Sequence, residues 1–140
     1  MKMCLPFLFF ENPMPIAPEP KGKLTLQTLS MPADTNPNGD IFGGWLLSQM
    51  DIAGAVLAQE TAKGRVTTVA ISGMSFLHAV PVGALVSCYA TLLSIGNTSI
   101  RIGIEVWIKD YREDQIIKVT EGEFIYVALN DKGEKRSIKK

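Results

Sequence analysis

The sequence predicts an α+β domain in which one long central helix is wrapped by a curved antiparallel β-sheet. Two observations lead to this prediction. Residues 43–63 form a helix-length segment that is apolar on nearly every side, which is typical of a buried helix. From residue 66 onward the chain is a succession of strand-like runs joined by short links. Because a single helix can cover one face of a sheet of long antiparallel strands, we expect the sheet to curl around it.

The chain divides into an arm and a domain. Residues 1–22 contain five of the eight prolines and a short apolar run at residues 4–10 that Pro6 interrupts. This run is too short to span a membrane, so no membrane insertion is expected. We predict an irregular N-terminal arm over residues 1–22 and one domain over residues 23–140, a length that suits a single core.

The first half of the domain supplies a strand, a loop and the helix. Residues 23–30 predict a strand with a polar face, and residues 31–40 are dense in Pro, Asn, Asp and Gly, which predicts a loop. Asp40 is a candidate N-cap of the helix. Gly64 is a candidate for the residue that ends the helix after Lys63.

Four strands are predicted in the second half, over residues 66–77, 84–95, 98–109 and 116–129. The third alternates most clearly, and one of its faces carries Ile100, Ile102, Ile104, Val106 and Ile108. Residues 95–98 predict a tight hairpin, and residues 111–115 a charged turn. The second face of the helix and the exposed sheet edges would invite a second subunit.

Composition argues against several functional classes. Fourteen basic and fourteen acidic residues give no net charge, so nucleic acid and anionic membranes are not expected partners. Neither a Walker A motif nor GxGxxG is present. One histidine and two distant cysteines make a structural zinc site unexpected, and we predict neither metal nor cofactor. Two thiols without a CxxC motif suggest a reducing, cytoplasmic location.

Asp51 is the residue around which a site is predicted. It lies in the apolar helix between Met50 and Ile52, where a carboxylate is costly to bury unless something pairs with it or uses it. It shares a helix face with small residues, namely Gly44, Ser48, Ala55, Ala58 and Ala62. Two structural interpretations explain these small residues. They let a strand or a second helix approach closely, or the alanines are present simply because alanine favours a helix. The acid at the centre of this stripe of small residues adds the interpretation of a functional site.

The start of the helix offers a second part of a site. Gly43 and Gly44 lie where a helix presents unpaired N–H groups and partial positive charge. These N–H groups could stabilise a carbonyl oxygen that becomes negative. The alternative is that both glycines only permit tight packing. Other nucleophiles are disfavoured: no GxSxG motif occurs, Cys88 falls in mid-strand, and His78 is expected to be exposed at a strand end.

Three segments carry a resemblance to a known family. They are MPADTNPNGDIFGGWLLSQMDIAGA (31–55), GRVTTVAISGMSFLHAVPVGALVSCYA (64–90) and IEVWIKD (104–110). Together they resemble the YciA-like acyl-CoA thioesterases of the hotdog-fold superfamily, over about residues 24–138. Two positions depart from the pattern. His78-Ala79 stands where relatives often carry Lys-Pro or Arg-Pro, and Ala84 stands where they often carry Asp.

The resemblance implies a hotdog fold and hydrolysis of acyl-CoA to a free acid and CoA. It implies that each active site lies at a dimer interface and that dimers join as trimers into homohexamers. Asp51 matches the catalytic carboxylate, and Asn36 matches an asparagine that the other subunit places opposite it. Gly43 and Gly44 match the place where the thioester carbonyl docks. Arg65 and His78 are candidate contacts for the CoA phosphates.

The chemistry keeps alternatives open at this point. Asp51 is expected to act as general base on water or as a nucleophile that forms a mixed anhydride. Two other functions remain, a non-catalytic acyl-CoA binding or assembly module and an acyl-thioester hydratase. The hydratase would need a catalytic histidine, and nothing in the sequence places His78 near the helix. The preferred acyl chain length is left undetermined.

Overall fold

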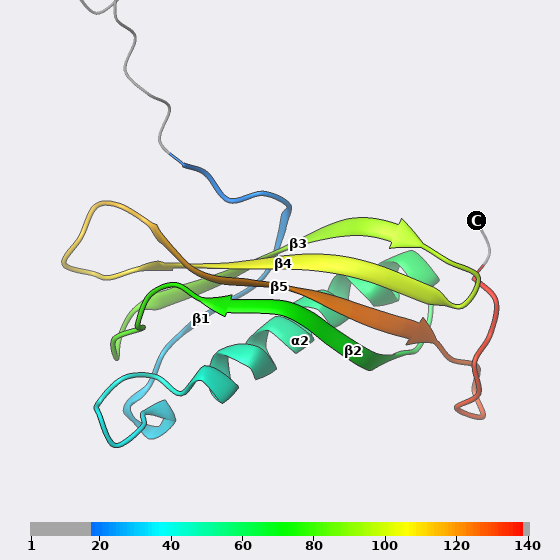
Figure 1. The fold of residues 1–140 in the computed structure, drawn as a ribbon, viewed down its shortest axis with the longest axis horizontal. Coiled ribbons are helices and arrows are strands. Elements are labelled where there is room, and N and C mark those ends of the chain that lie inside the picture. The colour runs from blue at the N-terminus through cyan, green and yellow to red at the C-terminus, as the bar shows by residue number, and fades with distance from the viewer. Residues whose placement is uncertain (1–17, 139–140) are drawn as a thin grey trace, which may run out of the picture.

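The computed structural model describes residues 18–138, so most of the expected N-terminal arm, and Cys4 with it, lies outside the described residues. Five strands and one long helix make up the fold (Figure 1). They are β1 (Lys23–Leu29), α2 (Gly43–Ala62), β2 (Val66–Phe76), β3 (Leu85–Ile95), β4 (Ser99–Lys109) and β5 (Ile117–Ala128), with a 3-10 turn η1 at Pro32–Asp34. The strands form one antiparallel sheet in the order β1-β3-β4-β5-β2. The predicted fold class and element order are confirmed.

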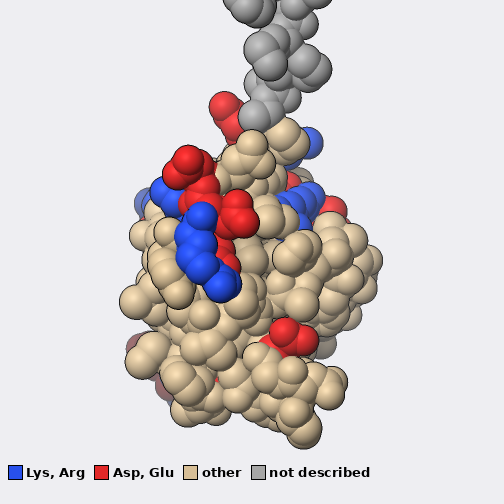
Figure 2. Space-filling model, turned by 90° about the vertical axis from the view of Figure 1, so that its left-hand side faces the viewer, with Lys and Arg blue, Asp and Glu red and all other residues tan. Residues whose placement is uncertain are grey.

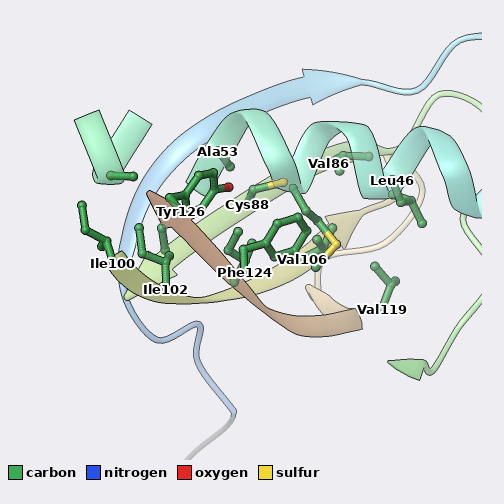
Figure 3. Packing of buried hydrophobic residues seen from close by; sticks show 14 of the residues in the cluster. Leu46, Ala53, Val86, Cys88, Ile100, Ile102, Val106, Val119, Phe124 and Tyr126 are labelled. Atoms are coloured by element: carbon green, nitrogen blue, oxygen red, sulfur yellow. The ribbon is translucent and has the colours of Figure 1, made fainter. Parts of the chain in front are cut away.

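The core lies between α2 and the face of the sheet that it crosses. The helix contacts all five strands, and Figure 1 shows it running along the curved sheet. Ile100, Ile102 and Ile104 of β4 are buried, as their alternation predicts, and they pack with Phe124 and Tyr126 of β5 (Figure 3). Burial of these side chains is the main source of the fold's stability.

The opposite side of α2 stays open in this chain. Ile52 is 53% exposed, although Met50 is fully buried. The helix is therefore enclosed toward the sheet only, and its second face stays exposed, as expected for a face that would invite a second subunit. Exposed apolar side chains also occur next to the helix and on β2, an edge strand; they include Phe42, Val69, Ile71 and Phe76. A surface of this kind marks an interaction site.

Both predicted helix ends need correction. Asp40 is not the N-cap, because its N–H and C=O are both taken by Asn36 and the helix begins one residue after Phe42. Phe42 is the N-cap and provides no side-chain cap. At the other end Lys63, with φ 54° and ψ 46°, is the left-handed residue, and Gly64 is not among the residues with positive φ. Among the described residues, no helix is long and apolar enough to cross a membrane.

Candidate active site

Asp51 lies half-buried in the middle of α2, at the border between its packed side and its open side. Its Oδ1 accepts a 2.5 Å hydrogen bond from Thr68 Oγ1 on β2. The Tyr126 hydroxyl on β5 donates to the Asp51 backbone oxygen at 2.8 Å and lies 3.3 Å from Oδ1. The acid that sequence reasoning expected to need a partner therefore has two hydroxyl neighbours.

Thr68 and Tyr126 reach Asp51 because they are direct partners in the β2–β5 ladder. Side chains of paired residues leave the same face of a sheet, and this face packs against the helix. Neither residue was predicted as part of the site. One signal was available, since Tyr126 alternates with the buried Phe124 and Ala128 and so brings a polar tip into the core.

The electrostatics of the pair keep Tyr126 neutral. Burial raises the pKa of the Tyr126 hydroxyl well above its usual range, and the negative charge of Asp51 and the hydrogen bond to it raise the pKa further. The hydroxyl is therefore a hydrogen-bond donor at every physiological pH. Within residues 18–138, Asp51 Oδ2 accepts no hydrogen bond, so this oxygen remains available to another group.

The stripe of small residues changes character along α2. Gly44 and Ser48 are exposed, Asp51 is half-buried, and Ala58 and Ala62 are buried against the sheet. The second half of the stripe thus serves close packing, as one structural interpretation proposed. The first half leads from Asp51 to the helix start along an open surface.

Asn36 is held in a closed loop just before α2. Thr35 and Ile41 form an isolated antiparallel bridge, and Asn36 Oδ1 accepts hydrogen bonds from the N–H groups of Asn38 (2.9 Å) and Asp40 (3.1 Å). The side-chain oxygen is used to hold this turn. Its Nδ2 makes no hydrogen bond to any of the described residues, so the amide is free to donate to a ligand or a neighbouring chain.

The loop, the helix start and the end of β2 enclose a surface pocket of about 400 Å³. Asn36, Gly43 and His78 all line it, together with apolar side chains such as Phe76. The pocket brings His78 to the helix start, which sequence reasoning did not expect. His78 is exposed, as predicted, and its Nδ1 lies 2.7 Å from the Ala79 oxygen.

The two glycines differ in their surroundings. A Cβ on Gly43 would lie 3.4 Å from the Phe76 ring, whereas a Cβ on Gly44 would meet nothing within 4 Å. An alanine side chain would therefore fit at Gly43 in ordinary van der Waals contact, and it would fit at Gly44 without any contact. Tight packing does not explain why either residue is glycine. In the described part of the chain, neither glycine N–H has an acceptor, because the first helical N–H groups to find one are those of Trp45 and Leu46.

Asp51 does not line the pocket that holds Asn36 and Gly43. Asp51 follows Gly43 by eight positions in the helix, or about 12 Å along the axis. One chain therefore presents two half-sites: an N-terminal half-site of Asn36, Gly43 and Gly44, and a carboxylate half-site of Asp51, Thr68 and Tyr126.

Arg65 and His78 are not brought together in one chain. They flank the two ends of β2, whose 11 residues span about 36 Å. Arg65 donates to the backbone oxygens of Asp131 (3.0 Å) and Asn130 (3.4 Å), which gives it a structural partner. Figure 2 views the end of the molecule that carries the start of α2, and its charges are of mixed sign rather than a cationic patch.

Cys88 has the structural role that its position predicted. It is fully buried in β3, and burial raises the pKa of its thiol to about 12. A group with this pKa is not a thiolate nucleophile near neutral pH. The strand order also separates β3 from β2, at whose end His78 lies. Within residues 18–138, no three His, Cys, Asp or Glu side chains gather as a metal site would require.

Comparison with known proteins places this arrangement in a family. The family described as the thioesterase superfamily matches residues 38–114, which include Gly43, Asp51 and Thr68. The acyl-CoA thioester hydrolase YciA of Salmonella typhimurium is 57% identical over 122 residues, which cover 85% of this chain and 92% of the relative. The chain belongs to the thioesterase superfamily.

Solved structures of other thioesterases have the same fold. A hexameric hotdog-fold thioesterase of Campylobacter jejuni, Cj0915, is 40% identical with a TM-score of 0.80, over 84% of this chain and 91% of that one. HI0827, described as a hexameric broad-specificity acyl-coenzyme A thioesterase, is 47% identical with a TM-score of 0.83, over 86% and 88%. That crystal structure is of a mutant in which an aspartate is replaced by alanine. The fold of this chain is the hotdog fold.

Proposed function

We propose that this chain hydrolyses acyl-CoA thioesters to a carboxylic acid and free CoA. Family membership and the names of relatives that are more than half identical support this activity. The observation that carries it at the level of atoms is the carboxylate of Asp51, held at Oδ1 by Thr68 while Oδ2 stays unpaired among the described residues. A fixed carboxylate with one open oxygen suits attack on a thioester carbonyl, directly or through water.

The reaction follows from the two half-sites. The oxygen of a water molecule, deprotonated by Asp51, adds to the thioester carbonyl, or Asp51 itself adds and water then cleaves the mixed anhydride. In both routes the carbon–sulfur bond breaks, the acyl group leaves as the acid, and CoA leaves as a thiolate that becomes the thiol by taking up a proton supplied by water. The N–H groups of Gly43 and Gly44 would stabilise the negative oxygen, an effect worth about 10²–10³ in rate.

We propose further that one active site combines half-sites from two chains. The separation of Asn36 from Asp51 in one chain, the exposed apolar side chains of α2 and β2, and the hexameric neighbours support this arrangement. Asn36 of one subunit would then orient water or substrate at Asp51 of another, within a dimer that assembles into a trimer of dimers. The free Cys88 thiol suits a reducing compartment, and we place the reaction in the cytoplasm.

The test is thiol release from a panel of acyl-CoA substrates of different chain length. Wild-type protein should release CoA, and the isosteric variant Asp51→Asn should lose this activity while it keeps the same oligomeric mass. Turnover retained by Asp51→Asn would contradict the role of this carboxylate. The panel also reports which chain lengths are preferred.

The same panel separates the remaining functions. Tight binding of acyl-CoA without thiol release would indicate a binding module. The place of His78 beside Gly43 is the one observation that favours a hydratase, and it is tested with an α,β-unsaturated acyl-CoA. Loss of the conjugated double bond, with the thioester intact and the reaction dependent on His78, would replace hydrolysis by hydration.

A further inference from the structure

We propose that Tyr126 is a positioning residue for Asp51, whose hydroxyl fixes the carboxylate so that Oδ2 faces the substrate. This inference rests on the proposed function, because it assumes that Asp51 carries the reaction. It assigns to β5 a part in the site that the comparisons do not indicate.

The contacts show how the hydroxyl acts on Asp51 from inside the core. The Tyr126 ring is fully buried and stacks on Phe124, with ring centroids 6.3 Å apart. Figure 3 shows both rings between β5 and the helix. The hydroxyl donates to the Asp51 backbone oxygen at 2.8 Å and lies 3.3 Å from Oδ1. One phenolic proton is thus shared between the main chain and the side chain of the same residue.

Gly54 makes this contact possible. It lies three residues after Asp51, hence on nearly the same side of α2. A Cβ at this position would lie 2.2 Å from the Tyr126 hydroxyl oxygen, nearer than real Cβ atoms come. A glycine in the interior of a helix lowers stability relative to alanine, so its presence here calls for a local reason. The space it leaves is occupied by the hydroxyl that touches Asp51 and by the Cδ1 methyl group of Ile104, which a Cβ at this position would approach to 2.7 Å.

The two carboxylate oxygens of Asp51 have different surroundings. Oδ1 receives the hydrogen bond of Thr68 and the approach of Tyr126, whereas Oδ2 has no partner among residues 18–138. Because Tyr126 stays protonated, its O–H donates toward Asp51, and it cannot act as the base that takes the proton Asp51 removes from water. A carboxylate fixed in this way keeps one reacting oxygen in one direction, and misplacement by about 1 Å can lower a rate about 100-fold.

Tyr126→Phe tests the proposal, because it removes the hydroxyl and keeps the ring. We expect kcat for thiol release to fall about 10- to 100-fold with little change in KM. A wild-type kcat would overturn the proposal. So would a loss of kcat/KM carried by KM alone, or a fall in kcat that a core variant of equal melting temperature reproduces, since either result indicates a structural effect only.

Gly54→Ala provides an independent route to the same contact. Its Cβ should displace the Tyr126 hydroxyl, so its effect on kcat should not add to that of Tyr126→Phe. Additive losses in the double variant would contradict a shared contact. If Gly54→Ala does not fold, the change in kcat and KM of Tyr126→Phe decides the question.

Two controls isolate the hydroxyl. Phe124→Leu disturbs the ring stack and should lower the melting temperature while kcat stays close to the wild-type value, whereas Tyr111→Phe removes an exposed hydroxyl and should change neither. Asp51→Asn is measured in parallel. If Asp51→Asn is inactive and Tyr126→Phe behaves as wild type, only this inference fails; if Asp51→Asn stays active, the proposed function of Asp51 fails as well.

Discussion

Asn36 lies beside the first turn of α2, whereas Asp51 of the same chain lies about two turns further along the helix. Asn36 lines the pocket at the helix start, and Asp51 makes its contacts with β2 and β5. A single chain therefore keeps the two predicted catalytic residues apart. If they act on one substrate, they must come from different chains. Mixing variants of the two residues tests this directly.

Two inactive variants should restore activity when they are mixed. Asn36→Ala and Asp51→Ala each spoil both sites of a symmetric dimer. A mixed dimer has one site with both residues intact and one with neither. With equal amounts and free exchange, half of the dimers are mixed, so about a quarter of wild-type activity should return. The measurement is thiol release before and after subunit exchange.

The control for this experiment is the double variant Asn36→Ala/Asp51→Ala mixed with wild type. In that mixture the mixed dimers carry no fully intact site, so activity should fall below the amount contributed by wild-type dimers alone before exchange. No recovery in the first mixture, with exchange verified by mass spectrometry, would mean that both residues act within one chain.

Gly44→Ala should separate folding from function. The added Cβ meets nothing within 4 Å, and alanine favours a helix over glycine by up to about 1 kcal/mol. We therefore expect an unchanged or higher melting temperature. Alanine keeps the N–H, so the variant acts by placing a Cβ where a thioester would approach. If a thioester oxygen docks at this N–H, kcat should fall toward the roughly 100-fold loss that is typical when one oxyanion donor can no longer be used. Wild-type kcat in this variant would show that the oxygen binds elsewhere.

The sequence was sufficient to predict the element order and most strand bounds. In β4 the alternation of five β-branched residues set the buried face, and all five are buried in the structure, although Trp107 on the opposite face is buried as well. The helix ends could not be predicted in this way. Asp40 has a side chain that is favoured at an N-cap. Its backbone is instead hydrogen-bonded to Asn36 within the loop, so Phe42 becomes the N-cap of α2. Long-range pairing overrode a local preference there.

The site was predictable only in part, for a related reason. Asp51 and the glycines are conspicuous within one helix, so a local pattern reveals them. Thr68 and Tyr126 join Asp51 through the register of two strands that are 58 residues apart in sequence at this pair. The sequence of a single strand does not reveal which residues it pairs with, because the register is fixed when the whole sheet assembles.

Lys63→Gly should stabilise the protein. Lys63 has a left-handed backbone, which a residue with a Cβ adopts at a penalty of about 1–2 kcal/mol and glycine adopts freely. We expect the free energy of unfolding to rise by about 1 kcal/mol, measured by urea denaturation. Lys63→Ala is the matched control, because it removes the same charge and keeps the Cβ. An equal gain in both variants would assign the effect to charge rather than backbone.

Glu105 should make stability depend on acid pH. Burial acts to raise the pKa of its carboxyl, but hydrogen bonds from Trp107 and the Lys21 N–H, with the charge of Lys118, lower the pKa overall. A lowered folded-state pKa adds stability that is complete above the unfolded-state value, near 4.3, and is lost as pH falls through the folded-state value.

The measurement compares urea unfolding of wild type and Glu105→Gln between pH 7 and pH 3. Wild type should be the more stable at pH 7, and the difference should shrink below about pH 4. A difference that stays constant over this range would show that Glu105 stabilises through packing rather than through its charge.

Strand β2 links the two half-sites. It carries Thr68 beside Asp51 and ends with Phe76 beside Gly43, and it is an edge strand of the sheet. A neighbouring chain that packs against this edge would contact both the N-terminal half-site and the carboxylate half-site. Turnover per molecule would then rise with the amount of protein present, so that a cell could adjust acyl-CoA breakdown more steeply than in proportion to expression.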